Sequence, residues 1–351
     1  MDRPTPGHEP GRSVTPPLRI DVHVHLAGVG TGDSGCWISP RFQKRYTFRL
    51  LRWWHGITPE QLRDSIDQDW VDRIATHVRE SELDRAVVLG FDGVYDARGE
   101  LDTERSQLVV PPSWVFEACR RHPGELLPGP SLNPFRRDAL ERLEECIAGG
   151  AALIKWLPSA QGIDPSSGRL TEFYRRLAEA RLPLLVHSGG GEMTFREIAP
   201  ELRELALLRA PLDAGVPVIC AHSATPVLFS RDPDQVPLLR TMLAEYPHLW
   251  VDNSGMANPS RFPYLPRLAR DPEVQVRTLY GSDFPVPSNA LYFARQLGPA
   301  EVWKLERLAN PFDRDIRIKR ALGYPDRTLT RAERVLANLD RWRGGVGAGP
   351  G

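Results

Sequence analysis

Side chains able to bind a metal recur along this chain at points where short apolar segments end. The first segment contains two of them, His23 and His25, within Asp21-Val-His-Val-His25. Side chains alternate between the two faces of a strand, so both imidazoles project to the same face and make half of a metal site. Four later apolar segments also close on polar residues, namely Lys155, His187, His222 and Asp283. The series predicts a metalloenzyme.

The residue types favour a catalytic rather than a structural metal site. Zinc and similar divalent ions take imidazole nitrogen and carboxylate oxygen, and catalytic sites leave one coordination position open to water. A single histidine is more often a hydrogen-bonded core residue. Five polar residues that end separate strands in chain order instead indicate one shared site, and they are His25, Lys155, His187, His222 and Asp283. The remaining histidines are expected to be structural or solvent-facing (His8, His77, His122 and His248), or are left undecided (His55).

Alternating strand and helix patterns predict the architecture. Eight apolar runs bounded by turn residues are expected to be strands: 19–25, 85–91, 126–131, 151–157, 183–187, 216–222, 249–253 and 277–283. Helical segments such as 136–148 and 171–181 separate them. This alternation predicts an α/β fold, a (β/α)8 TIM barrel with the metal site at the C-terminal rim of its strands, because active sites of such barrels lie there.

The domain prediction is one barrel over residues 18–342, with tails at 1–17 and 343–351 that are rich in Pro and Gly and are expected to be disordered. Two crossovers, 26–84 and 93–125, are longer than a barrel requires. The first contains basic residues at helical spacing beside apolar ones: Arg41, Arg45, Arg49 and Arg52 with Phe42, Tyr46, Leu50 and Trp53-Trp54-His55-Gly56. We interpret it first as a solvated helix packed on the barrel, second as a lid that supplies an anion-binding arginine, and third as a nucleic-acid contact.

Composition limits the partners. The 351-residue chain has 45 Lys plus Arg and 45 Asp plus Glu, so no overall field attracts nucleic acid or an anionic membrane. A small-molecule substrate is therefore expected, and a homo-oligomer is compatible with the sequence. The absence of a long apolar run or a signal-peptide pattern predicts a cytoplasmic protein. The scattered cysteines Cys36, Cys119, Cys146 and Cys220 argue against a disulfide framework or a zinc ribbon.

Several motifs add a family resemblance to this interpretation. They are Asp21-Val-His-Val-His25, Val186-His-Ser188, Ala221-His-Ser223, Tyr280-Gly-Ser-Asp-Phe-Pro285, and the stretches 154–164 and 310–323. Together they resemble the amidohydrolase superfamily, and within it the amidohydrolase-related branch that includes aminocarboxymuconate-semialdehyde decarboxylase-like proteins. The resemblance covers most of residues 19–340.

The resemblance implies a ligand set. His23, His25, His187 and Asp283 would bind one divalent metal, expected to be zinc, and His222 would bind a second metal or hold the attacking water. Lys155 stands where two-metal members carry a carboxylated lysine that bridges the ions. In the mononuclear decarboxylases of the branch, a lysine at this place need not bridge, so one ion or two are both compatible with the sequence.

We predict a metal-dependent hydrolase that cleaves an amide, lactone or ester bond of a small molecule with a metal-activated water. Asp283 would take the proton of the water, and His222 would orient the nucleophile or the carbonyl oxygen. Asp21 is expected either to hold a ligand imidazole or to cap local backbone.

Two alternatives stay open at this point. The first is non-oxidative decarboxylation of a small unsaturated or aromatic acid, and the second is a catalytically silent barrel that binds a ligand. Substrate choice would belong to loop residues, of which Trp37, Trp53, Glu192 and Asn253 are candidates.

Overall fold

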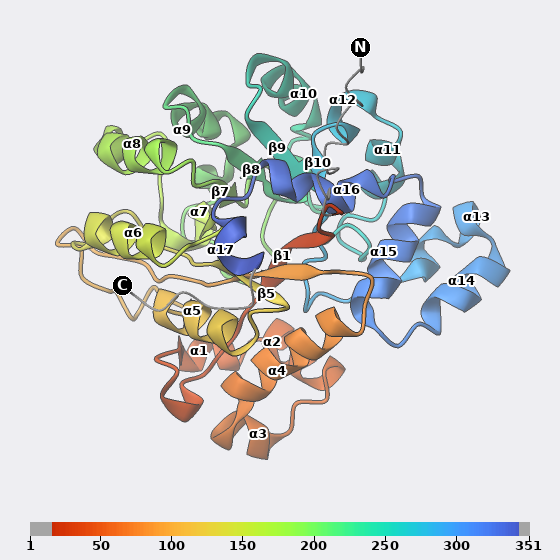
Figure 1. The fold of residues 1–351 in the computed structure, drawn as a ribbon, viewed down its shortest axis with the longest axis horizontal. Helices are drawn as coiled ribbons and strands as arrows, with labels where there is room; N and C mark the ends of the chain where they lie inside the picture. The colour runs from red at the N-terminus through yellow and green to blue at the C-terminus, as the bar shows by residue number, and fades with distance from the viewer. Residues whose placement is uncertain (1–15, 344–351) are drawn as a thin grey trace, which may run out of the picture.

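Eight parallel strands form the centre of the molecule, and helices surround them in a ring (Figure 1). The computed structural model describes residues 16–343. The strands are β1 (Ile20–His25), β3 (Arg85–Leu89), β5 (Leu126–Gly129), β6 (Ile154–Trp156), β7 (Leu184–Val186), β8 (Val218–Cys220), β9 (Leu249–Asp252) and β10 (Thr278–Leu279). Each lies within a range predicted from the apolar runs. The predicted tails, 1–17 and 343–351, fall almost wholly outside the described residues, and His8 lies outside them.

The strands pair in parallel in chain order, which gives the (β/α)8 TIM barrel that the sequence predicts. They form two sheets, with the orders β1-β3-β5 and β10-β9-β8-β7-β6. The hydrogen-bonded ladder is interrupted at the two seams between these sheets. There, isolated parallel bridges join Ser131 to Lys155 and Val24 to Phe284. Backbone hydrogen bonds of 2.7–3.0 Å also cross both seams.

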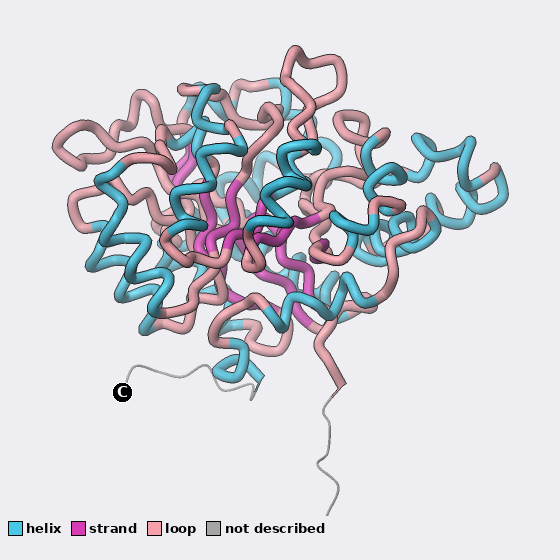
Figure 2. The backbone as a smooth tube through the Cα atoms, turned by 90° about the horizontal axis from the view of Figure 1, so that it is seen from above, coloured by secondary structure: helices cyan, strands magenta, loops and turns pink. Residues whose placement is uncertain are grey.

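Helices and long loops fill the connections between strands, and Figure 2 shows the strands enclosed by them. The helices are α1 (Pro40–Gln43), α2 (Tyr46–Trp54), α3 (Pro59–Asp64), α4 (Ile66–Arg79), α5 (Pro112–Arg121), α6 (Ala139–Ala148), α7 (Pro158–Gln161), α8 (Thr171–Glu179), α9 (Arg209–Asp213), α10 (Val236–Glu245), α11 (Tyr264–Ala269), α12 (Pro272–Gln275), α13 (Ala294–Leu297), α14 (Pro299–Glu306), α15 (Pro311–Ala321), α16 (Arg327–Thr330) and α17 (Leu339–Arg343). In the described part of the chain, none of them combines the length and apolar composition that a membrane span requires.

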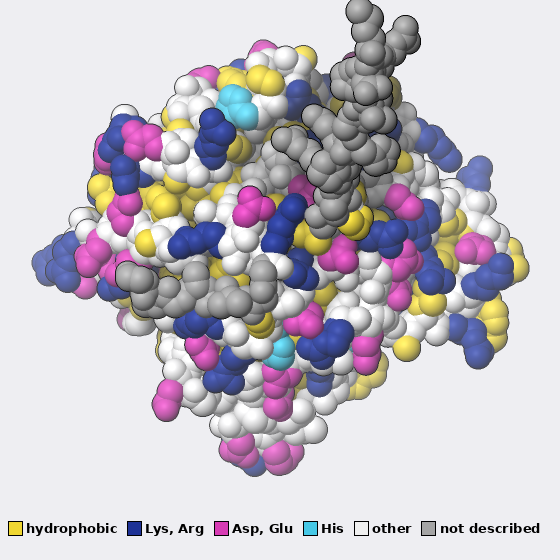
Figure 3. Space-filling view, in the orientation of Figure 1, with side chains coloured by type: hydrophobic (Ala, Val, Ile, Leu, Met, Phe, Trp, Pro, Cys, Tyr) yellow, Lys and Arg dark blue, Asp and Glu magenta, His cyan; other side chains and the backbone are white. Residues whose placement is uncertain are grey.

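The core follows from the two periodicities of the sequence. In β7, Leu185 belongs to one buried cluster, whereas its neighbours Leu184 and Val186 belong to another, as the two-residue repeat of a strand requires. Helix α4 buries Trp70, Ile74 and other residues of one face, spaced three to four residues apart. On the outside, charges of both signs intermingle over the face seen in Figure 3, as expected from equal numbers of acidic and basic residues.

The long first crossover lies against loops at the mouth of the barrel. Its basic amphipathic segment forms two helices, α1 and α2, which are separated at the extended residue Arg45; Phe42 of α1 is buried, whereas no residue of α2 is. Thr47 of this helix donates a hydrogen bond to the carbonyl of Thr194, and His55 Nε2, just after the helix, lies 2.9 Å from the carbonyl oxygen of Pro285. The helix therefore connects the loops that follow β7 and β10. A short antiparallel pair, β2 (Trp37–Ile38) with β4 (Leu108–Val109), joins the two long crossovers.

A buried carboxylate anchors this crossover. Asp67, at the start of α4, is fully buried and accepts hydrogen bonds from the backbone amides of Val29 at 2.8 Å and Gly30 at 3.0 Å. It also accepts from the hydroxyl of Ser34. A glycine at residue 28 makes room for it, because a Cβ there would lie 2.5 Å from the Asp67 carboxylate.

Replacement of Asp67 is expected to destabilise the protein. Asp67→Ala leaves three donors without their acceptor, and we expect the free energy of unfolding to fall by about 3 kcal/mol. Urea denaturation followed by circular dichroism measures this change. The control is Asp64→Ala on α3, where the side chain is exposed. Equal stability of the two variants would contradict the anchoring role of Asp67.

Candidate metal centre

The residues singled out by the sequence stand at one end of the barrel. His25 ends β1, Lys155 lies in β6, His187 follows β7, and Asp283 follows β10. His222 lies in a short 3-10 helix, Ala221–Ala224, directly after β8. Because the strands are parallel, all of these positions share the C-terminal rim.

Three of these residues converge most closely. His23, His222 and Asp283 each offer one ligand atom, and these atoms lie within 4.8 Å of one another. His23 Nε2 is 3.5 Å from Asp283 Oδ1. His25 joins the group, because its Nε2 lies 3.1 Å from the same carboxylate oxygen and 3.2 Å from His23 Nε2. The side chains of His25 and Asp283 keep 23% and 12% of their exposure, so this side of the group faces solvent.

Hydrogen bonds assign the lone pairs of the two central imidazoles. His23 Nδ1 lies 2.8 Å from the Asp252 carboxylate, and His222 Nδ1 lies 2.9 Å from the carbonyl oxygen of Ser254. Both partners accept, so each Nδ1 carries the proton and each Nε2 keeps its lone pair. His23 Nε2 and the Asp283 carboxylate are then two acceptors that face each other. A divalent cation between them would remove this conflict, so the donor set fits a metal ion.

Burial favours the protonation states that a metal requires. The pKa values of His23 and His222 lie well below the ordinary histidine value, chiefly because burial disfavours the imidazolium. Burial alone would raise the pKa of Asp283, but its interactions with His222, His25 and His23 outweigh burial and hold that pKa well below its usual range. Neutral imidazoles and an ionised carboxylate are the forms that bind a metal.

Lys155 competes for one of these lone pairs. Its Nζ lies 3.2 Å from His23 Nε2, and the side chain is almost fully buried. Burial lowers the pKa of Lys155 to about 8, although nearby carboxylates, led by Asp252, oppose the shift. The amine and a cation cannot share the same lone pair, so metal binding requires Lys155 to give up this contact.

His187 lies beside the group but turns away from its centre. Its ring packs edge-on against His222, with 4.9 Å between the ring centroids. Its Nε2 lies 3.1 Å from the carbonyl oxygen of Gly190, and its Nδ1 lies 3.6 Å from the carboxylate of Glu192. Burial, reinforced by the charge of Arg261, lowers the pKa of His187 to about 3. In this conformation, the carbonyl oxygen of Gly190, in the loop after β7, lies where a metal ion bound to Nε2 of His187 would lie.

Sequence reasoning missed Asp252 as a site residue. Asp252 closes β9 and is fully buried, and it accepts from His23 Nδ1 and from the backbone amide of His222, each at 2.8 Å. The available signal was the same as for the ligand candidates, since the apolar run Leu249-Trp-Val ends in this carboxylate.

Asp21 was expected either to hold a ligand imidazole or to cap local backbone, and the structure shows the second role. Its carboxylate accepts hydrogen bonds from the backbone amides of His23 and Ser282. Burial raises its pKa to about 7.

Arg261 was also missed, and no sequence pattern marks it. The side chain is 5% exposed and donates to the carbonyls of Thr225 at 3.2 Å and Gly191 at 2.9 Å. Among the described residues, no carboxylate lies within ion-pair distance of its guanidinium. Its charge lowers the pKa of both His187 and His222, which places a buried cation beside the centre.

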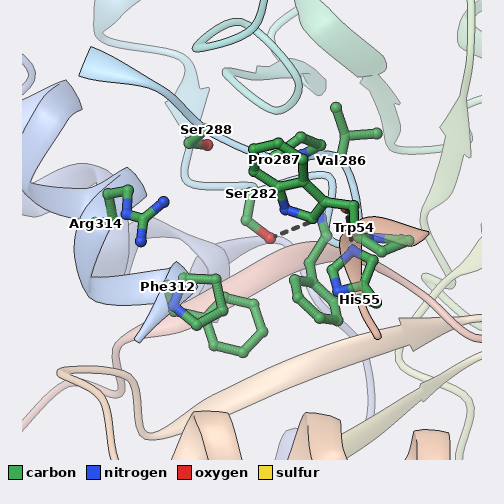
Figure 4. A pocket seen from close by; sticks show the side chains of 11 residues that line it. Trp54, His55, Ser282, Val286, Pro287, Ser288, Phe312 and Arg314 are labelled. Atoms are coloured by element: carbon green, nitrogen blue, oxygen red, sulfur yellow. Dashed lines mark hydrogen bonds between the residues drawn. The ribbon is translucent and has the colours of Figure 1, made fainter. Parts of the chain in front are cut away.

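The histidines that the sequence set aside have other partners. His122 pairs with Asp72 at 2.7 Å, His248 Nε2 lies 3.0 Å from the carbonyl oxygen of Leu212, and His77 packs on Phe284. His55, which was undecided, lies near Pro285 and lines a pocket beside the centre (Figure 4). Trp54, Ser282, Phe284 and Arg314 also line this pocket. It adjoins the loop that carries Asp283 without including the candidate ligands.

Removing the charge of Asp252 tests its hold on the two histidines. In Asp252→Asn the amide no longer fixes the His23 tautomer, and we expect divalent-metal affinity to fall by about 10-fold to 100-fold. Isothermal titration calorimetry with Zn²⁺ measures the loss. Asp271→Asn is the matched control, because Asp271 is 6% exposed and accepts from Arg240 and nearby amides outside the group. Unchanged affinity in Asp252→Asn would refute this role.

Two solved structures agree with the fold. An uncharacterised TIM-barrel protein from Bordetella bronchiseptica superposes with a TM-score of 0.56 at 15% identity, over 90% of this chain and 99% of that chain. A protein from Pseudomonas putida, named as a candidate 2-pyrone-4,6-dicarboxylic acid hydrolase, gives a TM-score of 0.52 at 15% identity, over 93% and 97%. A 5-carboxyvanillate decarboxylase from Sphingomonas paucimobilis gives 0.49 at 10% identity, over 91% and 99%.

No curated protein matches the sequence. The sequence model of the amidohydrolase family, in contrast, matches residues 20–308, which include every candidate ligand named above. This match covers most of the chain, and it agrees with the barrel and with the convergence of histidine and aspartate at its rim. The chain belongs to the amidohydrolase family.

Proposed function

We propose that this protein is a metal-dependent hydrolase of a small molecule, with His23, His25 and Asp283 as ligands of the first ion. The observation that carries the proposal is the opposition of two acceptors, the lone pair of His23 Nε2 and the Asp283 carboxylate, 3.5 Å apart at the barrel rim. His187 would join the ligand set after its ring turns away from Gly190. Imidazole and carboxylate donors without cysteine favour zinc.

The metal would supply an activated water and polarise a carbonyl oxygen. The protein's own residues would do the rest. Asp283 is ionised, because the neighbouring histidines hold its pKa low, so it can accept the proton of the water and pass it to the leaving group. His222 keeps a lone pair on Nε2 and lies in the same group, where it would orient the nucleophile or complete a second metal's coordination.

Arg261 supports a substrate that carries a negative charge. In the described part of the chain, the buried guanidinium of Arg261 donates to backbone carbonyls and pairs directly with no carboxylate, which favours a substrate carboxylate beside it. Such a substrate also suits the second candidate function, non-oxidative decarboxylation of a small unsaturated or aromatic acid. In that reaction the substrate carboxylate would leave as carbon dioxide, and His222 would relay a proton from water through Nε2 to the carbon atom.

The reaction class is tested by product analysis of one metal-loaded preparation. We expect at least about one equivalent of zinc per chain, and loss of activity on chelation with recovery when Zn²⁺ returns. Lactones and esters that carry a carboxylate are assayed by proton release, amides by release of the free amine, and aromatic acids such as 5-carboxyvanillate by release of carbon dioxide. Hydrolysis supports the first candidate, and carbon dioxide release supports the second.

Controls for this assay come from the centre and from the surface. Asp283→Asn should abolish turnover in either reaction. Lys304→Ala, on the exposed end of α14, should leave it unchanged. Wild-type protein that holds less than about a tenth of an equivalent of any divalent metal after supplementation would refute the metal centre.

Lys155 decides between one ion and two. An ammonium is repelled by nearby cations, so Lys155 must become neutral, be carboxylated or turn away when metal binds. We favour carboxylation by carbon dioxide, with loss of a proton, because the resulting carbamate and His222 would supply ligands for a second ion. Lys155→Ala should then lose one of two metal equivalents and most activity, with partial rescue by a small added carboxylate such as formate. A single equivalent in wild type, unchanged in Lys155→Ala, would support the mononuclear alternative.

A further inference from the structure

The segment that presents Asp283 has a strained backbone. Asp283 adopts φ +69°, in the left-handed region that residues other than glycine rarely occupy. This conformation costs about 1–2 kcal/mol, and it persists only where surrounding contacts determine it. The contacts of residues 281–283 therefore show what holds the carboxylate in place.

Hydrogen bonds from the barrel hold the amides of this segment. The Gly281 amide donates to Asn253 Oδ1 at 3.2 Å, and the Ser282 amide donates to Asp21 at 3.1 Å. The Asp283 amide donates to the carbonyl of His23 at 2.9 Å. These three bonds fix the inner side of the segment.

A buried ion pair on α15 holds its outer side. Lys319 Nζ donates to the Gly281 carbonyl at 2.6 Å and pairs with Asp315 Oδ2 at 2.5 Å, and both side chains are 1–2% exposed. Lys319 Nζ also lies 4.8 Å from the centre of the Tyr280 ring. The second oxygen of Asp315 accepts a hydrogen bond of 2.6 Å from the hydroxyl of Ser288. Helix α15 thus contacts the loop on both sides of Asp283.

Stability alone is a weak explanation for this pair. Burying two charges carries a desolvation penalty that can exceed their attraction, and apolar replacements of similar volume are often as stable. Neither residue is among the metal-ligand candidates. What an apolar pair cannot do is donate a directional hydrogen bond to the carbonyl two residues before Asp283.

We propose that Lys319 and Asp315 are positioning residues for Asp283. Asp315 orients the ammonium of Lys319, which holds the Gly281 carbonyl and so maintains the left-handed backbone that aims the Asp283 carboxylate at His23 and His25. The effect on metal binding rests on the function proposed above, whereas the effect on the backbone does not.

The test uses the double variant Lys319→Met/Asp315→Asn, which removes both charges and leaves neither unpaired. Asp315→Asn alone is the second variant, with a smaller change in volume. Arg331→Met is the matched control, because Arg331 is a buried cation, 8% exposed, that donates to the Thr278 carbonyl at the opposite end of the same strand. Hydrogen exchange of metal-free protein is measured for peptides that cover residues 281–284, and Zn²⁺ affinity is measured by calorimetry.

In the double variant, we expect exchange at residues 281–284 to accelerate and Zn²⁺ affinity to fall by about tenfold, with smaller changes in Asp315→Asn. Arg331→Met should lower the melting temperature without either change. Wild-type exchange in both Lys319→Met/Asp315→Asn and Asp315→Asn, or equal acceleration in Arg331→Met, would overturn the proposal. If wild type binds no Zn²⁺ but exchange still accelerates only in the ion-pair variants, the positioning role stands and the proposed function fails.

Discussion

The candidate metal centre depends on the buried carboxylate of Asp252. This fully buried group accepts hydrogen bonds from His23 Nδ1, from the His222 amide and from the amide of Ser254 at 3.0 Å. These bonds connect β1, β8 and β9, and they pin the proton of His23 to Nδ1. The lone pair that faces Asp283 is a consequence of that proton. A single carboxylate thus links residues of three strands and sets which nitrogen of His23 is free to bind a metal.

The loops that present the centre store conformational strain. His222, Ser223 and Asp283 all have positive φ, between +50° and +69°, although none is a glycine. Gly255, with φ +60°, approaches so closely that a Cβ there would lie 2.4 Å from the Asp283 carboxylate. Each left-handed residue costs about 1–2 kcal/mol and needs compensating contacts. Asp252 supplies such contacts at His222, and Asp21 and Lys319 supply them beside Asp283. Strain at the rim is therefore balanced by buried polar groups below and beside it.

Much of the fold was predictable because its signals are local. Apolar runs that end at His25, His187 and His222 mark strand ends, and the parallel order of the strands brings those ends to one rim. Asp252 carries the same signal, but its role is visible only when its partner is known, since His23 lies 229 residues away in the chain. Arg261 gave no signal at all, because it lies in an irregular segment and its partners, Thr225 and Gly191, are backbone carbonyls of other loops.

The sequence by itself determined the barrel and the types of donor available at its rim, because strand periodicity and residue chemistry are written along the chain. Only the tertiary structure decided how those donors point. It turned His187 toward Gly190, brought the amine of Lys155 to His23 Nε2, and gave Asp21 backbone amides rather than an imidazole. The physical reason is that each of these directions is set by a hydrogen-bond partner in a buried, crowded rim. Loop packing selects that partner, and no spacing pattern in the sequence records the choice.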